Sequence, residues 1–133
     1  MSVVSKTIKY LLDKNISVST AESCTGGLLA AEFTAVSGIS KIYKTGLITY
    51  SNDSKIKNLK VKPSTIKRYG AVSRQVCAQM CLHLHKISKS QLTFSTTGVA
   101  GPNGGTKLKP VGLVFIGLSV SYTHLTLPTT NSV

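Results

Sequence analysis

The sequence predicts a single α/β domain. Helical and extended patterns alternate along its 133 residues, which is the order expected of a sheet flanked by helices. At residues 20–27 an extended stretch runs into a turn that bears two glycines, and a helical pattern follows. Open α/β sheets bind their ligands at such carboxyl ends of strands. The nearly continuous apolar run at 111–120 is typical of a strand buried on both faces.

The first half of the chain predicts two helices and two strands. Val4, Ile8 and Leu11 fall at helical spacing, and Asn15 is a suitable residue to end that helix. Apolar and hydroxyl residues then alternate, as in a strand. The expected elements are a helix over 3–14, a strand over 16–21, a turn over 22–27, a helix over 28–35 and a strand over 46–50.

The second half predicts three helices and two more strands. The stretch Ser51-Asn52-Asp53 supplies N-cap chemistry for one helix, and Ser73 can cap another. Pro63 and Ser64 start a short helix that Gly70 ends. The expected elements are helices over 52–59, 63–69 and 74–89, a strand over 92–97, a Gly-rich loop over 98–105 and a strand over 111–120. The longest helix should bury a stripe formed by Val76, Met80, Leu84 and Ile87.

The composition excludes several classes of protein. A hydrophobic content of 41% excludes a wholly disordered basic tail. No apolar run approaches the ~18 residues that a membrane span needs. The N-terminus lacks a basic segment followed by an apolar one, so no secretory signal is indicated. We therefore expect a cytoplasmic protein.

The charge balance is strongly basic. The chain has 16 Lys and Arg against 4 Asp and Glu, a net charge of +12 and a pI near 9.9. This excess ordinarily indicates a nucleic-acid or anionic-membrane partner. However, Arg68 and Arg74 are the only arginines, and Arg is the usual bidentate reader of bases. We interpret the charge as a solvated Lys-rich surface that attracts an anionic small substrate, without a membrane or nucleic-acid partner.

The three cysteines are interpreted as free thiols. Cys24, Cys77 and Cys81 form an odd set in a chain without a secretory signal. Cys77, Cys81 and His85 recur every four residues, but a metal site needs a further ligand. We expect small buried thiols beside a core stripe, and no metal.

Three stretches have a composition suited to chemistry. Ser23 lies on a strand-to-helix turn, where backbone N–H groups can stabilise an anion, although an N-cap role would also explain it. Tyr50 ends a strand and Lys55 lies in the first turn of the next helix, so both could face one crevice. The helix dipole and partial burial would lower the pKa of Lys55, as a general base requires. An exposed helix with a solvated Lys is the alternative. The Gly-rich loop alone is a weak signal.

The motifs also occur in an order that resembles a known family. In sequence they read TAESCTGG (20–27), GLITYSNDSK (46–55), YGAVS (69–73), TGVAGPNGG (97–105) and KPVG (109–112). This closely resembles the C-terminal domain of the CinA (competence/damage-inducible) family over roughly residues 3–119. The resemblance implies a three-layer α/β sandwich around a mixed or mostly parallel sheet.

The resemblance also implies an activity. The enzymatic members of this family are the PncC nicotinamide-nucleotide amidases, which convert nicotinamide mononucleotide to nicotinate mononucleotide and ammonia without a metal or organic cofactor. The family's motif serine, tyrosine and lysine match Ser23, Tyr50 and Lys55, which are therefore the expected catalytic residues. A homo-oligomer is expected, with a dimer favoured. The residues expected to bind substrate are Glu22, Cys24, Thr25, Gly26, Gly27, Asn52, Thr97, Gly98, Gly101, Gly104 and Gly105.

One part of the chain departs from the family pattern. The family domain would occupy residues 1–120, and a Ser- and Thr-rich tail occupies 121–133. Family domains continue with a further strand, a loop and a C-terminal helix, which the tail does not resemble. We expect a truncated or misread gene end that removes part of the phosphate-binding surface. The alternatives to an amidohydrolase are a non-catalytic nucleotide- or nucleic-acid-binding module and an inactive fragment.

Overall fold

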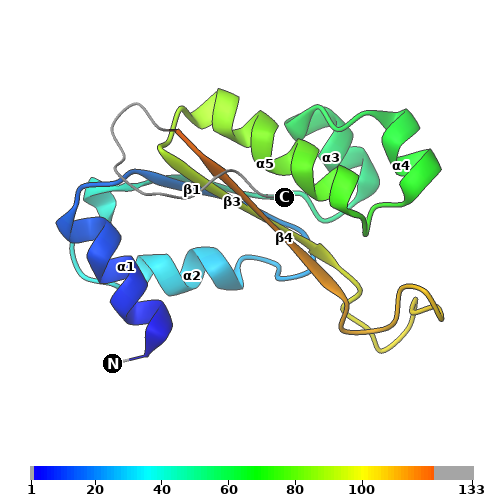
Figure 1. The fold of residues 1–133 in the computed structure, drawn as a ribbon, viewed down its shortest axis with the longest axis horizontal. Helices are drawn as coiled ribbons and strands as arrows, with labels where there is room; N and C mark the ends of the chain where they lie inside the picture. The colour runs from blue at the N-terminus through cyan, green and yellow to red at the C-terminus, as the bar shows by residue number, and fades with distance from the viewer. Residues whose placement is uncertain (1, 122–133) are drawn as a thin grey trace.

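In the computed structural model, which describes residues 2–121, a central sheet separates two layers of helices (Figure 1). The helices α1 and α2 lie on one side of the sheet, and α3, α4 and α5 lie on the other. The elements are, in order, α1 (Val3–Asp13), β1 (Val18–Glu22), α2 (Leu28–Thr34), the 3-10 turn η1 (Ile39–Lys41), β2 (Tyr43–Ile48), α3 (Asn52–Leu59), α4 (Pro63–Tyr69), α5 (Arg74–Ser88), β3 (Leu92–Gly98) and β4 (Val114–Val120). The predicted α/β class and three layers are confirmed.

The four described strands form one mixed sheet in the order β2-β1-β3-β4. The central strand β1 is parallel to β2 and to β3, whereas β4 is antiparallel to β3. Glu22 pairs with Ile48, and Ala21 pairs with Ser95. The carboxyl ends of three parallel strands therefore meet at one edge of the sheet, which brings residues 23, 49 and 96–98 together.

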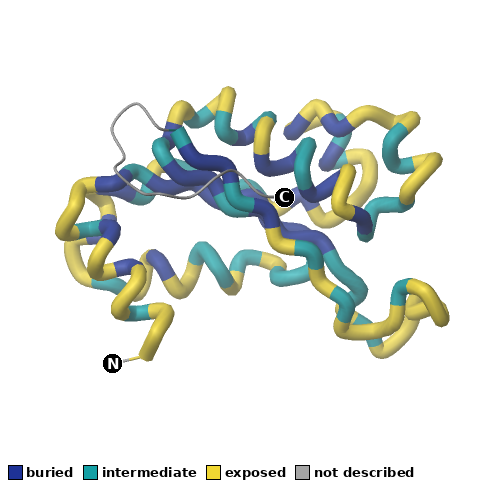
Figure 2. The backbone as a smooth tube through the Cα atoms, viewed as in Figure 1, coloured by how far each residue is buried: buried dark blue, intermediate teal, exposed yellow. Residues whose placement is uncertain are grey.

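The core lies on both faces of the sheet, whose two inner strands β1 and β3 are the most continuously buried (Figure 2). The α5 helix packs on β3 and β4 through a stripe in which Val76, Met80 and Leu84 are each 0% exposed. That part of the predicted stripe is confirmed. Ile87 is wrong, since it is 57% exposed in the last turn of α5, one residue before the helix ends at Ser88.

The last strand differs from its prediction. It begins at Val114 rather than at residue 111, because residues 111–113 belong to the turn that enters it. It is not buried on both faces, since Val114 is 43% exposed and Ile116 is 64% exposed. The reason is its place at the edge of the described sheet, where α2 does not reach over it. Residues 122–133, which include nearly all of the predicted tail, lie outside the described residues.

Within the described part of the chain, no helix is long and apolar enough to cross a membrane.

Candidate active site

Ser23 is held at the end of the central strand. Its N–H group donates to the carbonyl oxygen of Thr96 on β3 at 3.1 Å, and the residue is only 6% exposed. The chain then turns sharply into α2 through Gly26 and Gly27, whose φ angles of +59° and +104° lie in the left-handed region. Residues other than glycine rarely adopt this backbone conformation. The two glycines therefore allow α2 to start within a few residues of Ser23.

The second part of the site is the start of α3. The Ser51 hydroxyl caps this helix by accepting from the N–H of Ser54 at 3.0 Å. Asn52, predicted to bind substrate, is exposed at the first position of the helix. Lys55 faces the sheet instead and is 1% exposed, an unusual degree of burial for a lysine.

The ammonium nitrogen of Lys55 has three oxygen partners. Its Nζ lies 2.9 Å from the hydroxyl oxygen of Ser23 and 2.9 Å from each of the carbonyl oxygens of Thr49 and Tyr50. The Ser23 hydroxyl itself lies 3.4 Å from the same Tyr50 carbonyl. The structure thus brings the predicted serine and lysine into direct contact, although 32 residues separate them in the sequence.

The chemistry of this contact depends on the protonation state of the Lys55 amine. Burial lowers the pKa of Lys55 from its ordinary value, because the charged form loses its hydration. A carbonyl oxygen can only accept hydrogen bonds, so in neutral Lys55 the two carbonyls fix both N–H bonds. The remaining lone pair then faces the Ser23 hydroxyl, which is the arrangement of a general base beside a nucleophile.

Tyr50 contributes through its backbone. Its carbonyl oxygen accepts from Lys55, while the residue as a whole is 64% exposed. Within the described residues, its hydroxyl group has no hydrogen-bond partner. The predicted catalytic role of the Tyr50 side chain stays a prediction.

Glu22 contacts the protein rather than solvent. It is 1% exposed, and its Oε1 accepts from the Thr25 hydroxyl at 2.6 Å and from the N–H groups of Gly27 at 3.1 Å and Leu29 at 2.9 Å. Its Oε2 accepts from the N–H of Ala30 at 2.9 Å. This carboxylate, predicted to bind substrate, therefore stabilises the N-terminus of α2, where a negative charge is favoured.

Two amides beside Ser23 stay available for a ligand. The N–H groups of Gly26 and Leu28 donate to the carbonyls of Ser23 and Thr25. Those of Cys24 and Thr25 donate to no oxygen of the described residues. Burial raises the pKa of the Cys24 thiol, and these same two amides and the Lys55 charge oppose that rise, so they would favour an anion at this point.

The end of β3 closes the site on the side opposite β2. Thr97 is buried and donates its hydroxyl to the carbonyl of Ala71 at 2.9 Å. At Gly98 a Cβ atom would lie 2.6 Å from the carbonyl oxygen of Leu113 and 3.0 Å from the Cys24 sulfur. Gly98 thus permits β3 to approach the residue next to Ser23.

The Gly-rich loop returns to the sheet. The N–H of Val99 donates to the Leu113 carbonyl at 2.9 Å, and Gly101 packs against Val111, which leaves no room for a Cβ. Gly104 and Gly105 are exposed, and no hydrogen bond in the described residues joins either of them to the Ser23–Lys55 pair. Their predicted role in substrate binding stays a prediction.

Two site residues were missed by the sequence reasoning. Thr49 supplies a carbonyl to Lys55, and Thr96 supplies a carbonyl and a hydroxyl near the Ser23 amide, at 3.1 Å and 3.4 Å. Both directly neighbour predicted site residues, Tyr50 and Thr97. The parallel strand order would have identified them, but spacing along the chain does not reveal that order.

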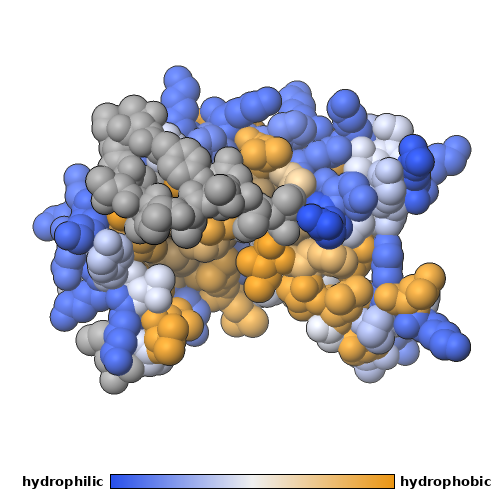
Figure 3. Space-filling view, in the orientation of Figure 1, coloured by the Kyte–Doolittle hydropathy of each residue, from blue (hydrophilic) through white to orange (hydrophobic). Residues whose placement is uncertain are grey.

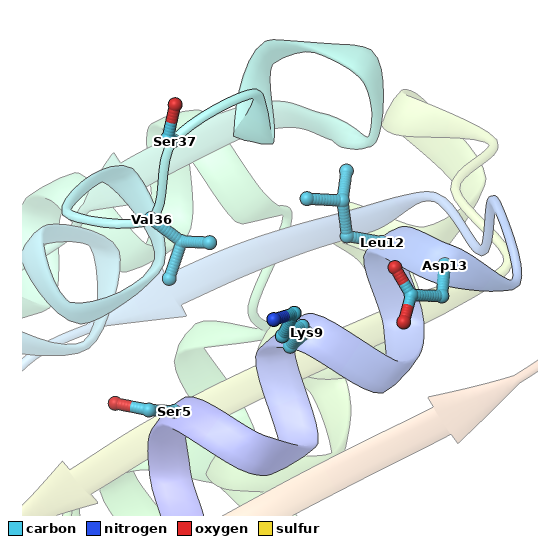
Figure 4. A pocket seen from close by; sticks show the side chains of 6 residues that line it. All are labelled: Ser5, Lys9, Leu12, Asp13, Val36 and Ser37. Atoms are coloured by element: carbon cyan, nitrogen blue, oxygen red, sulfur yellow. The ribbon is translucent and has the colours of Figure 1, made fainter. Parts of the chain in front are cut away.

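Two hollows of the described surface are lined by residues other than Ser23 and Lys55. A cavity of about 370 Å³ lies between α1 and the segment that follows α2, and Figure 4 shows Lys9, Leu12 and Val36 around it. An open groove of about 430 Å³ runs from Thr25 and Thr96 along β4. Figure 3 shows apolar side chains gathered along the lower part of β4, where Val114 and Ile116 are exposed.

The cysteines of α5 carry no metal site in the described residues. Across residues 2–121, no group of three or more His, Cys, Asp or Glu side chains could hold a metal ion. Cys77 and Cys81 are buried against β3, where their thiols contact Ser95 and the carbonyl of Thr93. They pack in the core, as predicted.

Comparisons with known proteins agree with this architecture. A curated relative from Clostridium novyi, named for competence-damage induction, is 54% identical over 112 residues, which is 84% of this chain and 27% of that protein. One from Acetivibrio thermocellus is 50% identical over 85% of this chain and 27% of its own length. The chain thus spans about a quarter of the curated relatives that it matches.

Solved structures share the fold as well. The competence/damage inducible protein CihA of Agrobacterium tumefaciens matches with a TM-score of 0.84 and 40% identity, over 88% of this chain and 71% of that one. A CinA superfamily protein of Escherichia coli matches with a TM-score of 0.82 and 32% identity, over 88% and 68%. The family model of the CinA C-terminal domain matches residues 1–130. The chain therefore belongs to the CinA C-terminal domain family.

Proposed function

We propose that this chain is a serine amidohydrolase that converts nicotinamide mononucleotide to nicotinate mononucleotide and ammonia. The observation that carries the proposal is the 2.9 Å contact between the Nζ of Lys55 and the hydroxyl of Ser23, made by a lysine that is 1% exposed. The choice of substrate follows from the family resemblance. The basic surface, with a net charge of +12, favours an anionic substrate of this kind.

The proposed reaction has two stages. Neutral Lys55 takes the proton of Ser23 as the hydroxyl oxygen attacks the carboxamide carbon, and the resulting oxyanion is stabilised by the N–H groups of Cys24 and Thr25. The C–N bond then breaks, and protonated Lys55 returns the proton to the nitrogen, which leaves as ammonia. Water attacks the acyl-serine with Lys55 again as base, releases the carboxylate and restores the Ser23 hydroxyl.

The direct test is product formation by the wild-type chain. With nicotinamide mononucleotide we expect ammonia and nicotinate mononucleotide in equal amounts, measured by a coupled ammonia assay and by mass spectrometry. Heat-unfolded chain and free nicotinamide serve as controls. A folded chain that forms neither product, yet binds generic DNA or RNA in a salt-dependent manner, would instead favour the nucleic-acid-binding alternative.

The rate should rise with pH as Lys55 loses its proton. Burial lowers the pKa of Lys55 from its ordinary value of 10.5, so the neutral base forms at a lower pH than for a solvated lysine. We expect kcat/KM to increase along one ionisation and to level off below pH 10.5. A profile that rises only around the ordinary lysine value, or that falls over the same range, would contradict a neutral Lys55 as the base.

A further inference from the structure

We propose that Glu22 is a positioning residue that fixes the nucleophile turn and keeps the amides of Cys24 and Thr25 directed at the reacting oxygen. The inference rests on the proposed function, because it assigns Glu22 a role in the same site. It replaces a role in substrate contact, which a carboxylate that is 1% exposed is not placed to fulfil.

The carboxylate of Glu22 lies between the end of β1 and the start of α2. Glu22 ends β1 and precedes Ser23, yet its carboxylate reaches forward to the N–H groups of Gly27, Leu29 and Ala30. Gly27, the residue that caps α2, has no side chain for this task. Glu22 therefore joins the end of the strand to the start of the helix and spans the turn that carries Ser23.

A chain of hydrogen bonds runs from Glu22 through the hydroxyls of Thr25 and Thr96 to the backbone amide of Ser23. An ionised carboxylate only accepts, so the Thr25 hydroxyl donates its one hydrogen to Glu22 at 2.6 Å. The 2.8 Å bond between the Thr25 and Thr96 hydroxyls must then be donated by Thr96. The hydroxyl oxygen of Thr96 in turn accepts from the N–H of Ser23, with 3.4 Å between this oxygen and the Ser23 nitrogen. The Glu22 carboxylate thus sets the donors of both hydroxyl bonds, those of Thr25 and Thr96.

Most backbone N–H groups that follow Ser23 already have a hydrogen-bond acceptor. Glu22 binds three of the backbone amides behind Ser23, and local turns bind two more, those of Gly26 and Leu28. Among the described residues, only Cys24 and Thr25 in the stretch 24–30 keep N–H groups without an oxygen acceptor. These two follow the nucleophile directly, where an oxyanion would form during attack.

Among the described residues, the Glu22 carboxylate forms no ion pair with a lysine, arginine or histidine. The ion pair of the described residues joins Lys57 to Asp53 on the exposed face of α3. The buried Glu22 carboxylate is instead compensated by three amides and a hydroxyl, an arrangement that depends on both the charge and the position of its oxygens. Glutamine keeps the shape but removes the charge and turns an amide donor toward one of the N–H groups.

The experiment measures the reactivity of Ser23 without relying on the identity of the substrate. The full chain is treated with a fluorophosphonate, a serine-directed probe, and labelling of Ser23 is followed by mass spectrometry. We expect Glu22→Gln to slow labelling by about 10-fold or more. Glu32→Gln is the matched control, since Glu32 is exposed on α2 and accepts no hydrogen bond from the described residues. It should label at the wild-type rate.

A second variant separates positioning from folding. Thr25→Val breaks the hydroxyl chain but leaves the three amide bonds of Glu22, so it should slow labelling while the melting temperature stays close to that of Thr25→Ser. With nicotinamide mononucleotide, Glu22→Gln should lower kcat and leave KM within about two-fold, since a positioning defect acts on the transition state.

Several outcomes would overturn the inference. One is an equal labelling rate in wild type, Glu22→Gln and Thr25→Val. Another is a loss of labelling rate in the variants that is fully explained by the fraction of unfolded chain. The third is no labelling of Ser23 in the wild type. The proposed substrate is judged separately. Normal labelling that depends on Glu22, without ammonia release from nicotinamide mononucleotide, would contradict the substrate and support the positioning role.

Discussion

A Ser23→Ala chain is expected to release ammonia from nicotinamide mononucleotide about 10⁴-fold more slowly than the wild type, or not detectably. Alanine removes the hydroxyl oxygen that contacts the Nζ of Lys55, which is also the atom that forms the acyl bond. Nucleophile deletions in hydrolases cost at least this much, and residual catalysis comes from the oxyanion-binding groups and substrate binding alone. A loss of 10⁴-fold corresponds to about 5 kcal/mol of transition-state stabilisation.

Binding and folding should survive this substitution. Ser23 is anchored by its backbone amide to Thr96, which alanine retains, so the melting temperature and the affinity for the substrate should change little. Ser40→Ala, at an exposed residue of η1, is the control for a generic serine substitution and should leave the rate unchanged. Turnover by a folded Ser23→Ala chain at a rate near the wild type would remove Ser23 from the mechanism.

The fold was predictable where local chemistry determines it. Hydroxyl residues and Pro63 indicated where α3, α4 and α5 start, because a hydroxyl satisfies a free amide and proline fits a helical φ angle. Strand bounds were less accurate. The second strand was expected from residue 46, whereas β2 begins at Tyr43. Tyr43 belongs to the strand because it pairs with Val18 of β1, and a local sequence pattern does not reveal that pairing.

Burial was predicted well for helices and poorly at the sheet edge. Val76, Met80 and Leu84 face the sheet because a 3.6-residue period places them on one stripe. The apolar run at 111–120 predicts a strand covered on both faces. Whether a strand is central or at an edge depends on strand order, and β4 lies at the edge of the described sheet. Val114 and Ile116 are exposed for that reason.

The candidate site shows the same division. The motifs identified Ser23 and Lys55, and the structure joins their side chains. The motifs could not distinguish a side-chain role from a backbone role. The side chain of Tyr50 was expected to act in the site, whereas the structure shows its backbone carbonyl in contact with Lys55. Nor could they show that Glu22 faces inward to α2, since a strand-terminal acid can point to either face until the helix behind it is placed.

Lys55→Met is expected to lower kcat by about 10²–10⁴-fold, the usual contribution of a general base. Methionine has a comparable unbranched stem and suits a site where the side chain is 1% exposed, but it cannot take the Ser23 proton. Lys55→Arg should be at least as inactive at every pH, because a guanidinium stays protonated and its lone pair is not available. The rise of the wild-type rate with pH should be absent from both variants.

The adjacent surface lysine provides the control that separates base catalysis from charge. Lys57 lies on the same helix, is 72% exposed and pairs with Asp53 at 3.2 Å. Exposed pairs of this kind contribute little, so Lys57→Met should keep both the wild-type rate and its pH dependence. If Lys55 only attracted an anionic substrate, the two substitutions would both raise KM and spare kcat. A folded Lys55→Met chain with an unchanged kcat would exclude Lys55 as the base, whereas loss of kcat in Lys55→Met alone would place the proton transfer at this one buried nitrogen.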